Sequence, residues 1–362
     1  KKLNLSSTEL FSKIKTDDLY FIVGGRIAQA LLSIALLRIL TTLFEKDQIA
    51  QYYIIHSIIF FYTYVILGGF SVYFNRYLLE PSTHPYSLFT RYFRQVILFG
   101  LVGIPINMLL LKLLEANGGH LLIIISIIFF NVTLSAFLRN LLTSINIFQK
   151  VRFFVSFNLL ALSIGLFLAT LLSNIFGAQI HNWFLGIILG EILVFPLVYK
   201  KFKLLSAASS NASKRTFLPL VDRDVFNFCG PLVLTNLLIW VQLYAYRLIT
   251  SKALGSDLLS DLAIALGVAL AVFAMVEAVI NQYFYPELLR NITQKEQADR
   301  VNAWSKLFKK AIIIYFFVGI FVIFCSKSLM IILTDEKFHQ IYIITSLASI
   351  IELGRVINNI FL

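Results

Sequence analysis

Apolar residues occur along the chain in long continuous runs rather than in alternation with polar residues. A run of about 17–25 apolar residues is long enough to cross the hydrocarbon core of a bilayer as a helix. The runs lie at 19–40, 52–74, 96–114, 121–148, 153–176, 183–199, 225–249, 262–284, 311–333 and 341–362. Membrane β-strands are shorter and alternate, so the pattern predicts an all-α polytopic membrane protein with ten spans.

Composition excludes several other classes of protein. The chain is 59% hydrophobic and 14% charged, whereas soluble domains are roughly 45–50% apolar and about 25% charged. Both cysteines, Cys229 and Cys325, lie in apolar runs, so we expect no disulfide framework. The five histidines are scattered and no Walker A sequence is present. We therefore expect no metal site, no cofactor, no catalytic residues and no ATP hydrolysis.

Cations are distributed unequally between the two sides of the predicted membrane. With a cytoplasmic N-terminus, 21 of the 31 Lys and Arg residues fall on the inner tail and loops, and five fall on outer loops. Short cytoplasmic loops are enriched in cations. The asymmetry predicts a cytoplasmic N-terminus. It also explains most of the formal charge of +12 without a nucleic-acid partner.

A weak internal repeat divides the chain. The segment 18–24 (DLYFIVG) aligns with 224–230 (DVFNFCG), and Arg139 in the fourth span aligns with Arg355 in the tenth. An even number of helices per unit gives parallel repeats, which recur in transporters. The repeat predicts an N-terminal six-helix lobe at 1–199, a cytoplasmic linker at 200–224 and a C-terminal lobe at 225–362. Four helices of this second lobe are present, and we expect about 50 further residues to complete it.

The cations that remain inside the predicted spans are all arginines: Arg26, Arg38, Arg139, Arg247 and Arg355. Lysine and arginine side chains can both extend from a span to the membrane interface. Placement at the interface therefore does not explain why all five of these cations are arginines. Arginine is favoured where phosphate or carboxylate is bound in a bidentate manner. We predict these five residues to be substrate-binding. The alternative for each is interfacial placement or a helix-packing salt bridge, and Glu352 is available to Arg355 three residues earlier.

Acids and aromatic residues add further candidates within the spans. The buried acids are Glu191, Glu277 and Glu352. Intramembrane carboxylates are candidates for proton or ion carriage, so we predict ion coupling at Glu277 and Glu191, with structural pairing to arginine as the alternative. His56 is expected to be an interfacial histidine. Aromatic residues that either line a cavity and stack on sugars or form an interfacial belt are Tyr52, Tyr53, Tyr62, Tyr64, Tyr73, Trp183, Trp240, Tyr244 and Tyr246.

Several segments resemble a known family. They are 21–26 (FIVGGR), Arg38, 47–52 (DQIAQY) and 68–76 (GGFSVYFNR). These segments resemble the O-antigen and polysaccharide flippases of the Wzx type. Those flippases share a superfamily with multidrug-toxin extruders and the peptidoglycan lipid II flippase. The resemblance implies two six-helix lobes around a central cavity, in the bacterial cytoplasmic (inner) membrane.

The resemblance also implies a substrate and a role for the arginines. The expected substrate is a polyprenyl-diphosphate-linked oligosaccharide, carried by alternating access for surface polysaccharide assembly. Arg26, Arg139 and Arg355 are expected to hold the diphosphate in the inward-facing state, and Arg247 and Arg38 in the outward-facing state. The expected partners are this lipid-linked glycan, the lipid bilayer and other polysaccharide-assembly membrane proteins.

Two rival functions make different demands on the sequence. A multidrug exporter of the same fold needs an acidic cavity for organic cations, whereas these spans hold five arginines against three glutamates. A membrane glycosyltransferase or polysaccharide polymerase needs a sizeable outer loop for catalytic residues, and the longest outer loop here has about a dozen residues. Both comparisons favour the flippase.

Overall fold

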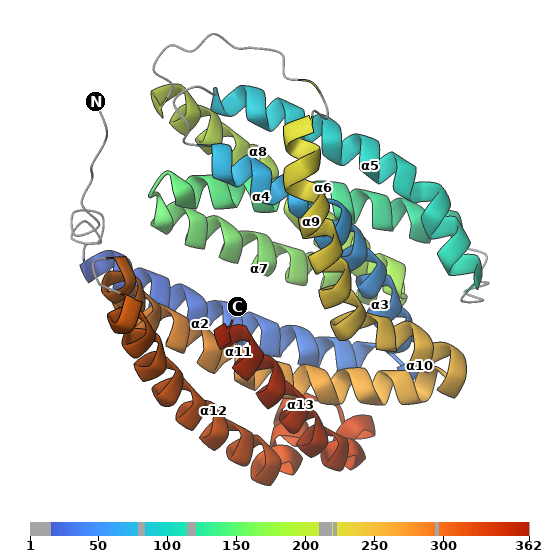
Figure 1. Ribbon diagram of the computed structural model, residues 1–362. Helices are drawn as coiled ribbons and strands as arrows, with labels where there is room; N and C mark the ends of the chain where they lie inside the picture. Colours follow the sequence, from blue (N-terminus) through green and yellow to red (C-terminus); the bar gives the residue numbers. More distant parts are fainter. Residues whose placement is uncertain are drawn as a thin grey trace. The chain divides into compact units, whose positions relative to one another are not determined.

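The computed structural model describes residues 16–78, 84–113, 121–209, 219, 223–293 and 297–361, and these form helices and no strand (Figure 1). In chain order, the first half consists of α2 (Thr16–Leu43), α3 (Lys46–Phe60), the π-helix η1 (Phe61–Ile66), α4 (Gly68–Tyr77), α5 (Pro85–Leu113), α6 (Leu121–Ile147), α7 (Val151–Ile175) and α8 (Ile180–Ser209). The second half consists of α9 (Arg223–Trp240), the π-helix η2 (Val241–Ala245), α10 (Tyr246–Leu254), α11 (Ser256–Thr293), α12 (Gln297–Leu333), the 3₁₀-helix η3 (Glu336–Ile341) and α13 (Tyr342–Phe361).

The predicted fold class is confirmed. Within the described residues, nine helical stretches are long and apolar enough to cross a membrane. They follow the predicted spans in order, except the third, predicted at 96–114, which lies on α5. Several helices are longer than the apolar runs. Thus α12 begins at Gln297 rather than at 311, because charged side chains beyond the hydrocarbon remain compatible with a helix.

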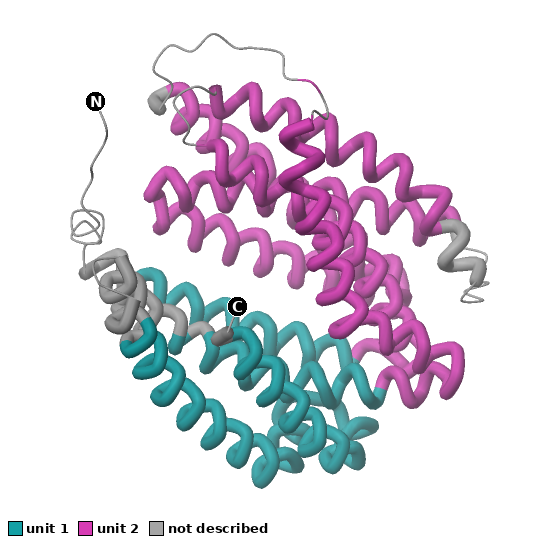
Figure 2. The backbone as a smooth tube through the Cα atoms, in the orientation of Figure 1, with its two compact units in different colours: residues 1–42, 261–362 teal, residues 43–260 magenta. Residues whose placement is uncertain are grey.

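Contacts group the chain into two compact units, which Figure 2 colours separately. Unit 1 contains residues 1–42 and 261–362, and unit 2 contains residues 43–260. The lobes expected from the sequence repeat, 1–199 and 225–362, stay a prediction. Residues 200–209 of the predicted linker continue α8, and most of its remainder lies outside the described residues.

In unit 2, α7 and α8 approach each other through small residues. A Cβ atom added at Gly186 would lie 2.3 Å from backbone atoms of Ala169, and one added at Gly190 would lie 2.5 Å from Gly165. Both helices thus carry small residues four positions apart on the contact face. Such spacing lets backbones pack closely in a membrane, where van der Waals contact replaces the hydrophobic driving force.

This close approach predicts that Gly186→Ala destabilises the protein. Overpacking of a well-packed interface costs about 1–3 kcal/mol, whereas alanine in an open helical site is favoured over glycine by roughly 0.5–1 kcal/mol. Gly354 on α13 has no atom within 4 Å of an added Cβ, so Gly354→Ala is the matched control. Thermal unfolding in detergent should show a lower midpoint for Gly186→Ala only. Equal midpoints would mean that α7 and α8 are not in tight contact.

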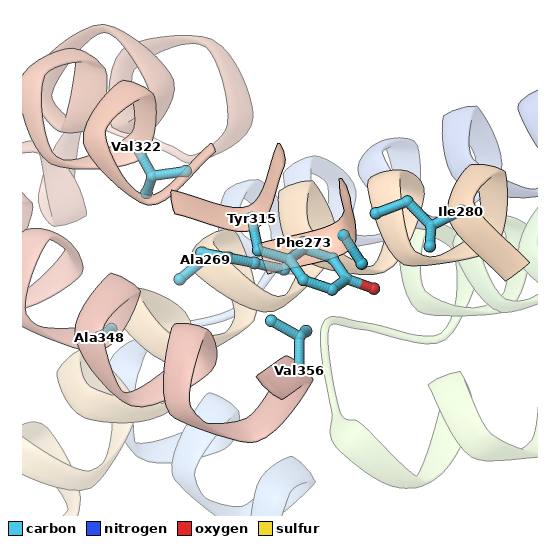
Figure 3. Close-up of a cluster of buried hydrophobic side chains, with 8 residues drawn as sticks. Ala269, Phe273, Ile280, Tyr315, Val322, Ala348 and Val356 are labelled. Carbon is cyan, nitrogen blue, oxygen red and sulfur yellow. The ribbon is translucent and has the colours of Figure 1, made fainter. Parts of the chain in front are cut away.

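The core of unit 1 joins three helices. Ala269, Phe273 and Ile280 of α11 pack against residues of α12 and α13, with the rings of Phe273 and Tyr315 at the centre (Figure 3). The remaining buried members are Ala311, Val322, Ala348 and Val356. Residues four apart share a helix face. The core therefore also fixes Glu277, one turn beyond Phe273, and Glu352, one turn before Val356.

Candidate functional site

Arg247 is held among aromatic rings in unit 2. Its guanidinium carbon lies 4.9 Å from the ring centre of Tyr53, 5.0 Å from that of Tyr244 and 5.7 Å from that of Tyr246. Its Nε donates to the Tyr246 hydroxyl at 3.2 Å, and its Nη1 donates to the Ser57 hydroxyl at 3.5 Å. Rings attract the cation but do not neutralise it. No carboxylate of the described residues pairs with Arg247.

Arg139 is a second arginine of unit 2 that makes no ion pair among the described residues. Its side chain is exposed, and the guanidinium carbon lies 5.5 Å from the ring centre of Tyr64. The charges of Arg139 and Arg247 both act on His56, which packs against the rings of Tyr52 and Phe60. Both of these sequence-predicted arginines thus lie in unit 2, each beside a tyrosine ring.

Glu191 lies on α8 beside the helix that carries Arg139. The Ser135 hydroxyl is 2.7 and 2.9 Å from the two carboxylate oxygens of Glu191. Ser135 and Arg139 are four residues apart on α6 and so share a face. The Ser135 hydroxyl thus binds the Glu191 carboxylate, and the positive charge of Arg139 also acts on that carboxylate. Ser135 is not among the residues expected from the sequence, and its one signal there is its spacing of four from Arg139.

In unit 1, Arg355 is paired with two acids. Its Nη2 lies 3.2 Å from a Glu277 oxygen and its Nε lies 2.6 Å from a Glu352 oxygen. The Asn359 amide donates to the other Glu277 oxygen at 2.9 Å. The contact expected from the Glu352–Arg355 spacing is therefore present. With both carboxylates ionised, this acidic cluster of Glu277, Glu352, Arg355 and Asn359 has a net charge of −1.

Arg26 lines a cavity of about 490 Å³ between α2 and α11 of unit 1. Its Nη1 donates to the Gln29 side-chain oxygen at 3.0 Å. Gln29 and Ser33 supply the other polar side chains, and the remaining lining residues are Val23, Ile27, Ala30, Ala271, Ala274, Met275, Val276 and Val279. An apolar cavity with a single cation at its wall suits an amphiphilic anion.

Arg38 is bound at the end of a neighbouring helix in unit 1. Its Nη1 donates to the carbonyl of Ile331 at 3.2 Å, in the last turn of α12. The adjacent Thr41 hydroxyl accepts from the Asp335 backbone N–H at 3.1 Å. The last carbonyls of a helix lack intrahelical donors. Arg38 therefore ties α2 to the C-terminus of α12.

The predicted aromatic candidates separate by burial. Tyr52, Tyr53, Tyr62 and Trp183 are buried among protein side chains, whereas Tyr64 is 45% exposed. Tyr73, Trp240, Tyr244 and Tyr246 are half-buried. Sequence reasoning overlooked Phe60, whose ring contacts both Tyr64 and Tyr244.

Comparison with known proteins bears on the fold. No protein-family model matches the chain, and no curated protein matches its sequence. The structure is similar to the crystal structure of the eukaryotic MATE transporter AtDTX14, with a TM-score of 0.59 and 15% sequence identity over 93% of this chain and 79% of that one. The chain has a MATE transporter fold. This similarity concerns the fold, and the Wzx-type assignment stays a prediction.

The MATE fold and the apolar helices make this a multi-pass membrane protein. The cytoplasmic N-terminus and the bacterial inner membrane stay predictions from charge and resemblance.

Proposed function

We propose that the protein is a flippase that carries a polyprenyl-diphosphate-linked oligosaccharide across the membrane by alternating access. The observation that carries this proposal is the pair Arg139 and Arg247. Both lie on apolar helices, and neither has a carboxylate partner among the described residues. The similarity to a MATE transporter supports the coarser part of the proposal, a transporter rather than an enzyme.

An arginine without an ion pair in a span is costly, by about 2.5–3.5 kcal/mol or more at the bilayer centre. Such residues are retained where they face water or meet an anion during the functional cycle. A diphosphate satisfies guanidinium groups well, because its oxygens accept the paired N–H donors in a bidentate manner. Arg139 and Arg247 are therefore suited to bind the charged group of the lipid.

The cavity at Arg26 supports the same class of substrate. Its apolar wall suits a polyprenyl chain, while Arg26 and Gln29 supply donors for a phosphate oxygen. Arg26 in unit 1, and Arg139 and Arg247 in unit 2, each keep their predicted role as a ligand of the diphosphate. Arg355 and Arg38 join them only where the cycle releases their present partners.

The acidic cluster of unit 1 favours a second candidate, a multidrug exporter of the same fold. Two carboxylates against one guanidinium leave negative charge near Glu277. Such a site can take a proton, a metal cation or an organic cation. In the flippase proposal the same cluster is the ion-coupling site, which keeps Glu277 in its predicted role, with Glu191 as the corresponding acid in unit 2.

Ligand binding separates the two candidates. We expect a polyprenyl-diphosphate-linked oligosaccharide to raise the thermal unfolding midpoint of the purified protein in detergent, because a ligand that binds only the folded state stabilises it. Ethidium, a planar organic cation, should leave the midpoint unchanged. Stabilisation by ethidium alone would favour the multidrug exporter.

A further inference from the structure

Five side chains of unit 2 follow one another in a continuous series, in the order Arg247, Tyr244, Phe60, Tyr64 and Arg139. Arg247 lies 5.0 Å from the ring centre of Tyr244. The ring centres are 4.7 Å apart between Tyr244 and Phe60 and 5.0 Å apart between Phe60 and Tyr64, with interplanar angles of 13° and 14°. Arg139 completes the series at 5.5 Å from Tyr64. We call this series the aromatic stack.

Two π-helices build the aromatic stack. Tyr64 belongs to η1 and Tyr244 to η2. π-Helical insertions are rare and are frequently found at functional sites. Here α9, the helix that leads into η2, is bound to η1 and α3, because the Asn236 amide donates to the Tyr64 carbonyl at 2.8 Å and the Trp240 indole N–H donates to the Ser57 carbonyl at 2.9 Å. Tertiary contacts thus fix the backbone at Tyr64 and the side chain of Trp240, the residue before η2.

The end of the aromatic stack formed by Tyr64 and Arg139 is exposed. Tyr64 is 45% exposed, whereas Tyr62, Thr63 and Val65 beside it are buried. A tyrosine that faced acyl chains would not carry a guanidinium on its ring, because the charge would be exposed to hydrocarbon. The exposed ring with Arg139 is therefore a surface for water or a polar ligand.

We propose that Tyr64 and Arg139, supported by Phe60 and Tyr244, bind a sugar ring of the lipid-linked oligosaccharide. A pyranose has an apolar C–H face and a rim of hydroxyl groups. The part of the Tyr64 ring left exposed beside Phe60 and Arg139 contacts the C–H face, while the guanidinium donates to ring hydroxyls or to the carboxylate of an acidic sugar. This inference rests on the proposed function and deepens it: the protein recognises the glycan as well as the diphosphate.

The test compares two ligands and three variants. The ligands are a polyprenyl-diphosphate-linked trisaccharide of neutral hexoses and the same polyprenyl diphosphate without sugar. The variants are Tyr64→Leu, Tyr64→Phe and the control Phe167→Leu, which changes another exposed ring of unit 2, on α7. Binding of each ligand is measured on the detergent-purified full chain.

For the wild type we expect the trisaccharide lipid to bind more tightly than the bare lipid. Tyr64→Leu should weaken binding of the trisaccharide lipid about three- to tenfold and leave the bare lipid unaffected. Tyr64→Phe and Phe167→Leu should bind both ligands as the wild type does. Equal binding of the two ligands by the wild type, or equal losses for both in Tyr64→Leu, would overturn the sugar subsite while leaving the flippase intact. Failure of the wild type to bind either lipid would overturn the proposed function itself.

Discussion

Arg139→Ala is expected to reduce export of the lipid-linked oligosaccharide about 10- to 100-fold while the protein remains folded. Hydrogen bonds to charged groups contribute about 1.5–3 kcal/mol each. In Arg139→Ala the diphosphate lacks these bonds at the step where it leaves water, so that step is slower. Folding should be retained because Arg139 has no ion pair among the described residues, so its removal leaves no carboxylate unpaired. Initial rates of export by reconstituted protein measure the effect.

Two variants make this result specific. Arg139→Lys keeps the charge but loses the bidentate donor geometry, so export should fall between the wild type and Arg139→Ala. Lys203→Ala removes one positive charge from an exposed position of α8 and should export normally. Full export by Arg139→Ala, in a protein that elutes as a single folded species, would remove Arg139 from the substrate path.

Arg355→Ala is expected to destabilise unit 1 by about 3 kcal/mol, the lower end of the range for breaking a buried ion pair. The variant leaves two carboxylates facing each other without their cation. The side chain of Glu352 is 9% exposed and that of Glu277 is 20% exposed, so water restores only part of the lost interaction. The thermal unfolding midpoint in detergent should fall clearly.

The cause of that fall is tested by rescue. Arg355→Ala combined with Glu277→Gln and Glu352→Gln removes the repulsion and should regain most of the lost stability. Arg38→Ala is the matched control, because among the described residues this arginine hydrogen-bonds to a backbone carbonyl and makes no ion pair. A net contribution of about 1 kcal/mol is typical of such a bond. Equal losses for Arg355→Ala and Arg38→Ala, with no rescue by the amides, would contradict a stabilising role for the cluster.

The spans were predictable from the sequence because membrane helices satisfy their own backbone hydrogen bonds, so length and apolarity suffice to identify them. Local pairs were also predictable. Glu352 and Arg355 are three residues apart, and their contact follows from helix geometry alone. Glu277 reaches the same arginine across 78 residues of sequence, and no local pattern encodes that distance.

Other features depend on packing between distant segments. The π-helices η1 and η2 interrupt runs that read as ordinary apolar helices. The side chains that bond to the backbone at η1 and α3 come from Asn236 and Trp240, more than 170 residues later. The contact of Arg38 with α12 likewise joins positions 293 residues apart. The sequence could therefore identify the arginines as candidate ligands. Only the tertiary structure distinguishes Arg355, which is ion-paired, from Arg139 and Arg247.

The central claim, transport of an anionic lipid-linked glycan, is tested most directly in proteoliposomes that contain the wild-type protein. One set contains a polyprenyl-diphosphate-linked oligosaccharide and the other contains ethidium, each under the same imposed pH gradient. We predict protein-dependent translocation of the glycan lipid, reduced in Arg139→Ala, and no movement of ethidium. Protein-dependent transport of ethidium without translocation of the glycan lipid would contradict the account.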